Sequence, residues 1–459
     1  MPALMENRLG DRPTPLLGRL LSIALPMVVS QSSDTVMMFA DRLFLSRLGE
    51  AYLSAAMSGG LTAFMVSSLF VGTVGYTAAV VAQLFGAGRK QDCAEATVQG
   101  LILALICYPL ILALSPLARY LFVVAGQSPL QVNLGYEYFR VIIFGSIFLV
   151  LRYALSGFFL GIGRTRVVML ANLAGMLANL PANYMLIYGK LGFPALGLTG
   201  AAIGTVLGSM ITFLILLAFY LRGDNRREFA THRGFRFRGS TMRTLVRFGA
   251  PAGVEMLLNV AAFNLFVQFL YSYGTGVAAA VTIAFNWDIV AFIPMLGMSS
   301  ATTALVGQFV GARDFGQARR AAYLSLRVAW VYSGTMVIVF LAATGALVRT
   351  FAAGFPGDAG EITRLATVLI RLASIYTLAD SAQLVFAGAL RGAGDTRWVM
   401  RVSVALHWVF AVAVIVSIRV LRISPVTAWV AFIVFIVLLG ISMFLRFRGS
   451  RWLDTRMID

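Results

Sequence analysis

The residues best suited to chemistry in this chain are acidic side chains placed inside long apolar segments. There are five of them: Asp34, Asp41, Glu255, Asp288 and Asp380. A charged side chain at the centre of a bilayer costs about 2.5 to 3.5 kcal/mol on insertion scales, so these carboxylates are expected to face protein or water. Carboxylates in such places bind protons, metal cations or organic cations reversibly. The pattern predicts an ion or cation pathway.

Two of these acids share one predicted helix, near residues 17–46. Asp34 and Asp41 are seven residues apart, which places them two turns apart on the same helix face. Pro26 lies upstream, where it removes a backbone hydrogen bond and supplies a bend. A bent helix that carries buried carboxylates responds to protonation, because loss of the charge changes the partners that the side chain keeps. For Asp41 the alternative is an ion pair with nearby arginines at the helix end.

The remaining acids lie in the second half of the chain. Asp380 is in the middle of an apolar segment and has no basic residue within one turn. We expect it to attract a cation; the alternative is a structural network with Ser381 or Gln383. Asp288 either lines the same site or forms a structural pair.

Other reactive side chains are few. Cys93 and Cys107 lie around a single apolar segment and provide neither a disulfide framework nor a Cys-rich metal site. His407 is isolated, which favours a core histidine bonded to a neighbouring helix over a proton relay. The glycine pairs of 161–163 and 392–394 lack the context of a phosphate-binding loop. With no recognisable triad or zinc site, the chain is predicted not to be an enzyme and to need no cofactor.

The elements that position these residues are predicted from composition. The chain has 459 residues, 59% of them hydrophobic and 12% charged, with a mean hydropathy of +0.84. Soluble domains are about half apolar and about a quarter charged. At about 20 residues per crossing, there is room for about a dozen transmembrane helices. The predicted helices lie near 17–46, 53–83, 97–123, 133–161, 166–190, 196–221, 245–272, 277–309, 320–350, 360–391, 397–418 and 425–446. The fold class is therefore an all-α polytopic membrane protein.

The formal charge of +18 indicates membrane orientation rather than nucleic-acid binding. The basic residues lie between hydrophobic blocks and not on a soluble face with interleaved aromatic residues. Alternate loops, the N-terminal region and the predicted linker 223–244 are rich in arginine. Since Lys and Arg near helix ends are retained in the cytoplasm, both termini and the linker are predicted to be cytoplasmic.

The chain contains an internal repeat. A shift of 225 residues matches Pro26 with Pro251, Gln83 with Gln308 and Gly86 with Gly311, and a shift of 231 matches Gly161 with Gly392 and Arg166 with Arg397. Matching proline, glutamine and arginine residues distinguish duplication from chance similarity among apolar residues.

Each copy has six predicted helices, so both enter the membrane from the same side. The predicted domains are an N-lobe (1–222, helices 1–6), the cytoplasmic Arg-rich linker (223–244) and a C-lobe (245–459, helices 7–12). Parallel repeats related by an axis along the membrane normal place a cleft between two bundles, where transporters commonly bind their substrates.

Three stretches resemble the multidrug and toxic compound extrusion (MATE) family. They are 26–41, the pair 81–88 (VAQLFGAG) and 305–312 (LVGQFVGA), and 387–396 (AGALRGAGDT). The resemblance covers essentially the whole chain. It implies twelve helices in two six-helix lobes that form a V, and antiport of organic cations against protons or sodium ions.

The resemblance also implies functional residues in the N-lobe. Asp41 matches the family's first-helix aspartate, fifteen residues after the proline. Asn179 and Asn183 look like its fifth-helix partners, and Thr205 looks like the sixth-helix hydroxyl. Together with Asp34, they form the predicted ion-coupling set, and sodium is the one metal expected, at Asp41 or at the acid of the other lobe.

A second set is implied in the C-lobe. Asp380 resembles the tenth-helix acid of the NorM-like branch, and Asp288 is a further candidate for the same cation site. Where that branch has a seventh-helix glutamate, this chain has Asn259. Glu255, one turn away, is the candidate replacement. Pro26 and its repeat mate Pro251 are the predicted hinges.

The resulting hypothesis is a NorM-like multidrug antiporter, monomeric and located in the cell inner membrane. It exports cationic or amphipathic organic compounds in exchange for protons or sodium ions. The alternative is a flippase for lipids or lipid-linked precursors, whose anionic head groups require a cleft lined by Arg or Lys. A membrane scaffold is a third option, but it leaves the buried carboxylates without a purpose.

Overall fold

The computed structural model describes residues 15–124, 127–232, 236–352, 359–455 and 457. This part of the chain is almost entirely helical and contains no strand. The first half forms α1 (Leu16–Ser46), α2 (Glu50–Gly75), α3 (Thr77–Gly86), α4 (Lys90–Ala113), α5 (Ser115–Val124), α6 (Pro129–Gly161), α7 (Thr165–Tyr188), α8 (Gly197–Tyr220) and the short α9 (Gly223–Phe229). The second half forms α10 (Gly239–Tyr271), α11 (Thr275–Gly311), α12 (Phe315–Ala342), α13 (Thr344–Ala352), α14 (Ala359–Ala393), α15 (Thr396–Arg419), α16 (Pro425–Arg448) and the 3-10 helix η2 (Arg451–Asp454).

Eleven described segments are long and apolar enough to cross a membrane. The helix α7 is not among them, although it packs between α1 and α8 as the remaining span of the twelve. Its sequence contains Asn172, Asn179 and Asn183, and these amides lower its hydropathy. This span carries two of the predicted site residues, Asn179 and Asn183.

Several helix boundaries differ from the predicted ones. The predicted helices 53–83, 97–123 and 320–350 are divided at Tyr76, Leu114 and Ala343. The helices α4 and α10 begin at Lys90 and Gly239, about two turns earlier than the prediction of 97 and 245. The prediction followed apolar residues only, whereas the first turns of both helices are polar. The linker is accordingly shorter than 223–244.

The two lobes pack through contacts that repeat about a pseudo-two-fold axis. On one side α2 meets α10, where a Cβ added to Gly72 would lie 2.7 Å from the Cα of Gly253. On the other side α11 meets α1, where a Cβ added to Gly297 would lie 2.7 Å from the backbone nitrogen of Val28. Gly72 and Gly297 are repeat mates at a shift of 225 residues, and so are Val28 and Gly253. The reciprocal contacts confirm the parallel duplication.

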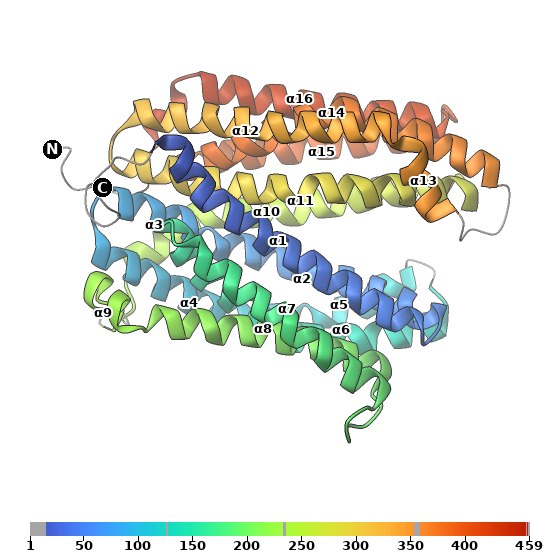
Figure 1. Ribbon diagram of the computed structural model, residues 1–459, viewed down its shortest axis with the longest axis horizontal. Helices are drawn as coiled ribbons and strands as arrows, with labels where there is room; N and C mark the ends of the chain where they lie inside the picture. The colour runs from blue at the N-terminus through green and yellow to red at the C-terminus, as the bar shows by residue number, and fades with distance from the viewer. Residues whose placement is uncertain (1–14, 125–126, 233–235, 353–358, 456, 458–459) are drawn as a thin grey trace.

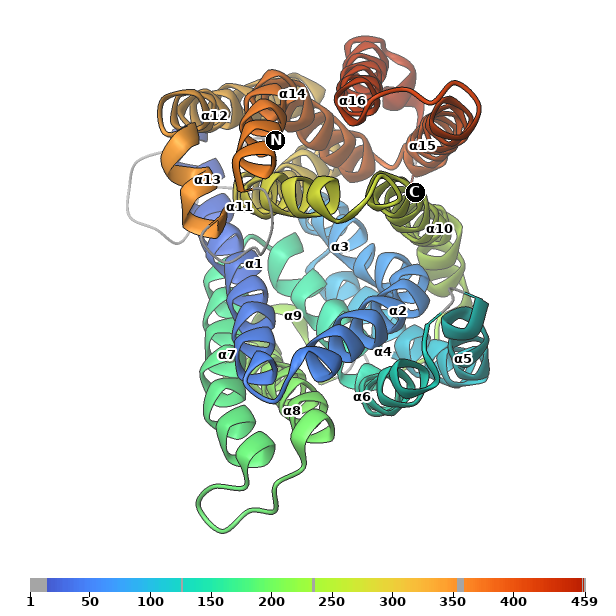
Figure 2. The ribbon, with the colours of Figure 1, turned by 90° about the vertical axis from the view of Figure 1, so that its right-hand side faces the viewer.

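The lobes are joined at one end and splay apart at the other, which gives the V shape (Figure 1). We call the joined end, where α9 lies, the linker end. Viewed along the helices, α10 to α16 form one group and α2 to α8 the other, with α1 running between them (Figure 2).

The linker helix α9 is fastened to the N-lobe by Glu228. Its carboxylate accepts from Lys90 at 2.9 Å and from Arg164 at 2.5 Å. Partial burial raises the pKa of Glu228, but the two cationic donors outweigh it and leave the pKa below its usual value. The carboxylate therefore stays ionised and holds α9 against the starts of α4 and α7.

Candidate functional site

In the N-lobe, Asp41 of α1 meets polar side chains of α7 and α8. Asp41 is buried, with 6% of the residue exposed. It accepts a hydrogen bond from the amide of Asn183 and another, of 2.8 Å, from the Oγ1 of Thr205. Asn183 also donates to the Oδ1 of Asn179 at 3.1 Å. The structure therefore brings together four residues that the resemblance placed in one site.

Close packing of α7 on α8 makes this arrangement possible. Asn179 and Asn183 are four residues apart and lie on the same face of α7. Opposite them α8 carries Gly204, and a Cβ at that position would overlap the Oδ1 of Asn183. Only a glycine leaves room for the amide to turn toward Asp41.

The polar chemistry of this N-lobe site suits a small cation or a proton. No ion pair holds Asp41 among the described residues; Arg42 donates to the sulfur of Met38 instead. Two buried atoms, the Nδ2 of Asn179 and the Oδ1 of Asn183, have no hydrogen-bond partner. A carboxylate beside uncommitted amide groups can bind a cation through oxygen atoms or accept a proton. The alternative of a helix-end ion pair with Arg42 or Arg47 is not what the structure contains.

Tyr138 of α6 is a member of this site that the sequence reading missed. Its phenol is 6% exposed and lies beside Thr205 and the Asp41 carboxylate. The sequence contains 15 tyrosines, and no acidic residue lies three or four positions from Tyr138, on the same helix face. No local signal therefore distinguishes this tyrosine from the others.

Asp34 does not join Asp41. Its two oxygen atoms accept from Arg152 of α6 at 3.2 and 3.4 Å, and the guanidinium is buried. The two residues are 118 positions apart in the chain. Asp34 therefore lies outside the cluster around Asp41, with an arginine as its counter-ion, and its part in ion coupling stays a prediction.

In the C-lobe, Asp288 of α11 and Asp380 of α14 line one small cavity with Tyr376. The cavity has a volume of about 10 Å³, close to the smallest that holds one water molecule. The phenol of Tyr376 donates to the Oδ1 of Asp288 at 2.7 Å. No described side chain donates to Asp380; the Oγ of Ser381, a proposed structural partner, donates to Leu378 instead. Two carboxylates that line one cavity, of which only Asp288 receives a bond from a neutral donor, can attract a cation.

Glu255 and Asn259 lie apart from this acid pair. Glu255, 3% exposed, forms an ion pair of 2.7 Å with Arg391. Asn259 donates to Ser403 at 2.8 Å, and His407 contacts the carbonyl of Ser403 on its own helix rather than on a neighbour. Glu255 therefore does not take the place of a missing acid beside Asp380, because an arginine from α14 binds it.

The Glu255–Arg391 pair leads to a stability prediction. We expect Glu255→Gln to lower the free energy of unfolding by about 1 to 3 kcal/mol, because a half-buried guanidinium then loses its counter-ion. Thermal denaturation in detergent measures the effect. Glu137→Gln is the control, since an amide oxygen there can still accept from Thr199. Replacing both partners, Glu255→Met with Arg391→Met, should recover most of the loss; equal melting temperatures for parent and Glu255→Gln would contradict the prediction.

The packing at Gly204 leads to a second prediction. Gly204→Ala should displace the amide of Asn183 from Asp41 and strongly reduce the protein's activity, with an overpacking cost of about 1 to 3 kcal/mol. Gly334→Ala is the matched control, because a Cβ at Gly334 meets nothing within 4 Å. That change should be neutral or slightly stabilising. Activities and melting temperatures of both variants check this, and a fully active Gly204→Ala would refute it.

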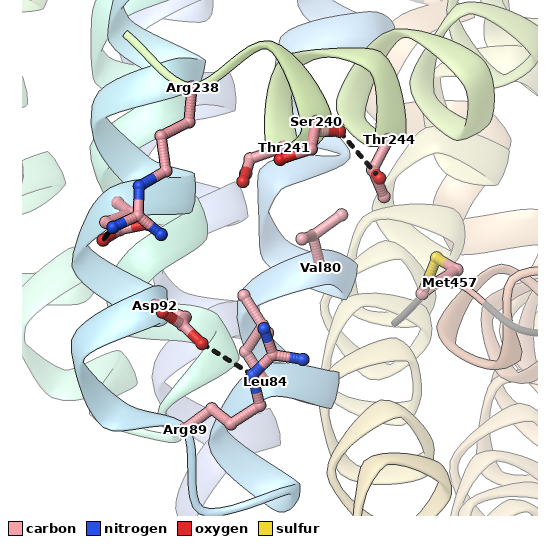
Figure 3. Close-up of a pocket in the computed structure, with 10 residues that line it drawn as sticks. Val80, Leu84, Arg89, Asp92, Arg238, Ser240, Thr241, Thr244 and Met457 are labelled. Atoms are coloured by element: carbon pink, nitrogen blue, oxygen red, sulfur yellow. Dashed lines mark hydrogen bonds and ion pairs between the residues drawn. The ribbon is translucent and has the colours of Figure 1, made fainter. Parts of the chain in front are cut away.

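A larger cavity, of about 250 Å³, lies at the linker end between α4 and the start of α10 (Figure 3). Its charged side chains are paired: Arg89 with Asp92 at 2.6 Å and Arg238 with Glu95 at 2.8 Å. Asp41, Asp288 and Asp380 are not among the residues that line this cavity.

The described residues form eleven apolar spans and α7, arranged in two related lobes with carboxylates buried inside each lobe, and this defines a polytopic membrane transporter. The model of the MatE family matches residues 26–185 and 251–417, one match per lobe. The chain belongs to this family, and it is a transporter rather than an enzyme.

Solved structures of transporters share the fold. A MOP superfamily transporter from Pyrococcus furiosus, described as having a binding pocket of reverse polarity, is 22% identical with a TM-score of 0.85, covering 98% of this chain and 100% of that one. A MATE protein in a bent conformation is 21% identical with a TM-score of 0.84, covering 96% and 98%. An outward-facing multidrug resistance MATE transporter is 22% identical with a TM-score of 0.83, covering 97% and 99%.

Proposed function

We propose that this transporter exports cationic or amphipathic organic compounds in exchange for protons or sodium ions. The observation that carries the proposal is the buried Asp41, whose carboxylate receives hydrogen bonds from Asn183 and Thr205 and forms no ion pair with an arginine among the described residues. A carboxylate held only by neutral donors can gain and lose a cation without breaking an ion pair.

The substrate cation is assigned to the C-lobe pair, Asp288 and Asp380. Their shared cavity is also lined by Phe292 and Met295. Apolar and aromatic walls around carboxylates suit organic cations, through burial, cation–π contact and charge pairing. At about 10 Å³ the cavity admits only part of such a molecule, so the remainder is expected to bind between the lobes.

The proposed cycle alternates the two lobes about hinges at Pro26 and Pro251. Both prolines lie inside their helices, where each removes a backbone hydrogen bond. Solved MATE structures include a bent and a straight conformation. The arginine-rich linker end is assigned to the cytoplasm, with both termini there, in a monomer of the cell inner membrane.

Transport of a fluorescent organic cation tests the proposal directly. Purified protein in liposomes is given a pH gradient or a sodium gradient in separate experiments. Accumulation driven by one of them supports antiport and names the coupling ion. Absence of accumulation under both gradients contradicts it.

The flippase alternative requires uncompensated basic residues for an anionic head group. Arg152 and Arg391 are paired with Asp34 and Glu255. Arg42, which follows Asp41 in α1, donates to the sulfur of Met38 and forms no ion pair among the described residues. In the C-lobe cavity, the charged side chains are the carboxylates of Asp288 and Asp380, and neither forms an ion pair among the described residues. This favours cationic cargo.

A further inference from the structure

The linker end holds a reciprocal pair of hydrogen bonds between the lobes. Gln83 of α3 donates to the carbonyl of Gly392 in the C-lobe at 2.9 Å. Gln308 of α11 donates to the carbonyl of Gly161 in the N-lobe at 2.8 Å. The glutamines are repeat mates at a shift of 225 residues and the glycines at a shift of 231. The two bonds are therefore one interaction made twice about the pseudo-two-fold axis.

The backbones meet with the same symmetry. A Cβ added to Gly86 would overlap the carbonyl of Gln308, and a Cβ added to Gly311 would overlap the carbonyl of Gln83. Each glutamine thus both donates across the interface and packs against the glycine that ends the partner lobe's helix. The same sequence pattern, a glutamine followed by a glycine three residues later, occurs in both repeats.

These hydrogen bonds are shielded from water. Gln83 and Gln308 are each 2% exposed. A buried amide that loses its partner carries the cost of desolvation, so each bond favours the joined state more than an exposed bond would. Two further contacts add to the same end: the hydroxyl of Tyr76 donates to the carbonyl of Arg391 at 2.7 Å, and Arg19 donates to Gln308 at 3.4 Å.

We propose that Gln83 and Gln308 form a clasp that sets the equilibrium between the joined and the open linker end. Opening the transporter at this end must separate α3 from α14 and α11 from α6, so both bonds break in the same step. The clasp acts on conformation alone, independently of the substrate and the coupling ion proposed above.

Distances between spin labels test the clasp without a transport assay. Labels are placed on the exposed repeat mates through Arg166→Cys and Arg397→Cys, one in each lobe at the linker end. Cys93 and Cys107 are buried and are expected to stay unlabelled. Gln83→Met and Gln308→Met keep the side-chain volume and remove the donor. Each single variant should raise the ratio of the open population (long distances) to the joined population (short distances) about fivefold, as expected for the loss of one net hydrogen bond. The double variant, which loses both bonds, should raise this ratio about twenty-five-fold.

The matched control is Gln131→Met. Gln131 donates to Ser54 within the N-lobe, so its loss should leave the distances unchanged. Should the methionine variants not fold, Gln83→Asn and Gln308→Asn, whose shorter amides cannot reach the carbonyls, replace them. A folded double variant with the parent's distance distribution, or an equal shift in Gln131→Met, overturns the clasp.

Discussion

Asp41→Asn should reduce gradient-driven export of an organic cation to the level of protein-free liposomes. Asparagine keeps the shape of the side chain but removes its charge and its exchangeable proton, so neither a proton nor a sodium ion is held at the N-lobe site. In the parent protein, Asn183 and Thr205 donate to the two carboxylate oxygen atoms of Asp41. In the variant, the NH2 group of the new asparagine would face one of these donors. We expect the loss under whichever gradient drives the parent protein.

The control for this variant is Asp224→Asn in the linker. Asp224 is exposed and its nearest cation, Arg222, is 3.9 Å away. Both variants should elute as folded protein from gel filtration. Export by Asp41→Asn at the parent's rate would remove Asp41 from the coupling mechanism and leave the fold assignment intact.

Asp380→Asn should raise the KM for a cationic substrate about tenfold or more, the range expected when a charged hydrogen-bond partner is lost. Asp380 receives no hydrogen bond from any described side chain, so its charge is available to the substrate. The carboxylate of Asp288 is already bound by the phenol of Tyr376, so less of its charge is available to the substrate. We therefore expect Asp288→Asn to raise the KM less than Asp380→Asn does. Initial export rates over a range of substrate concentrations give both values.

An uncharged amphiphilic substrate separates charge recognition from structural damage. Its KM should change little in Asp380→Asn, because burial and not charge pairing binds it. Equal losses for charged and uncharged substrates would mean that Asp380 supports the structure of α14 instead of recognising the cation.

Helix locations followed well from hydropathy, while helix ends and breaks did not. The first turn of α4 is polar, and α10 opens with Gly239 and Ser240, so a search for apolar blocks starts both helices too late. These turns form because they pack on neighbouring helices, as Cys93 does against the Val81 region of α3. Helix turns that are stabilised by such packing need not be apolar, so a search for apolar segments does not find them.

The sequence by itself determined the membrane class, the duplication and the set of acidic residues in spans. Hydropathy and repeats are properties of the chain read in order, and transfer into a bilayer depends on local composition. The family resemblance added the partners of Asp41, which the structure brings together.

Only the tertiary structure decided which acids remain uncompensated. Asp34 is bound by an arginine 118 residues away and Glu255 by one 136 residues away, while Asp288 and Asp380 lie together around Tyr376. A hydrogen-bonded ion pair requires the two groups to be within a few ångströms, and that separation is set by how helices pack across the bundle. Spacing along the chain carries no information about it.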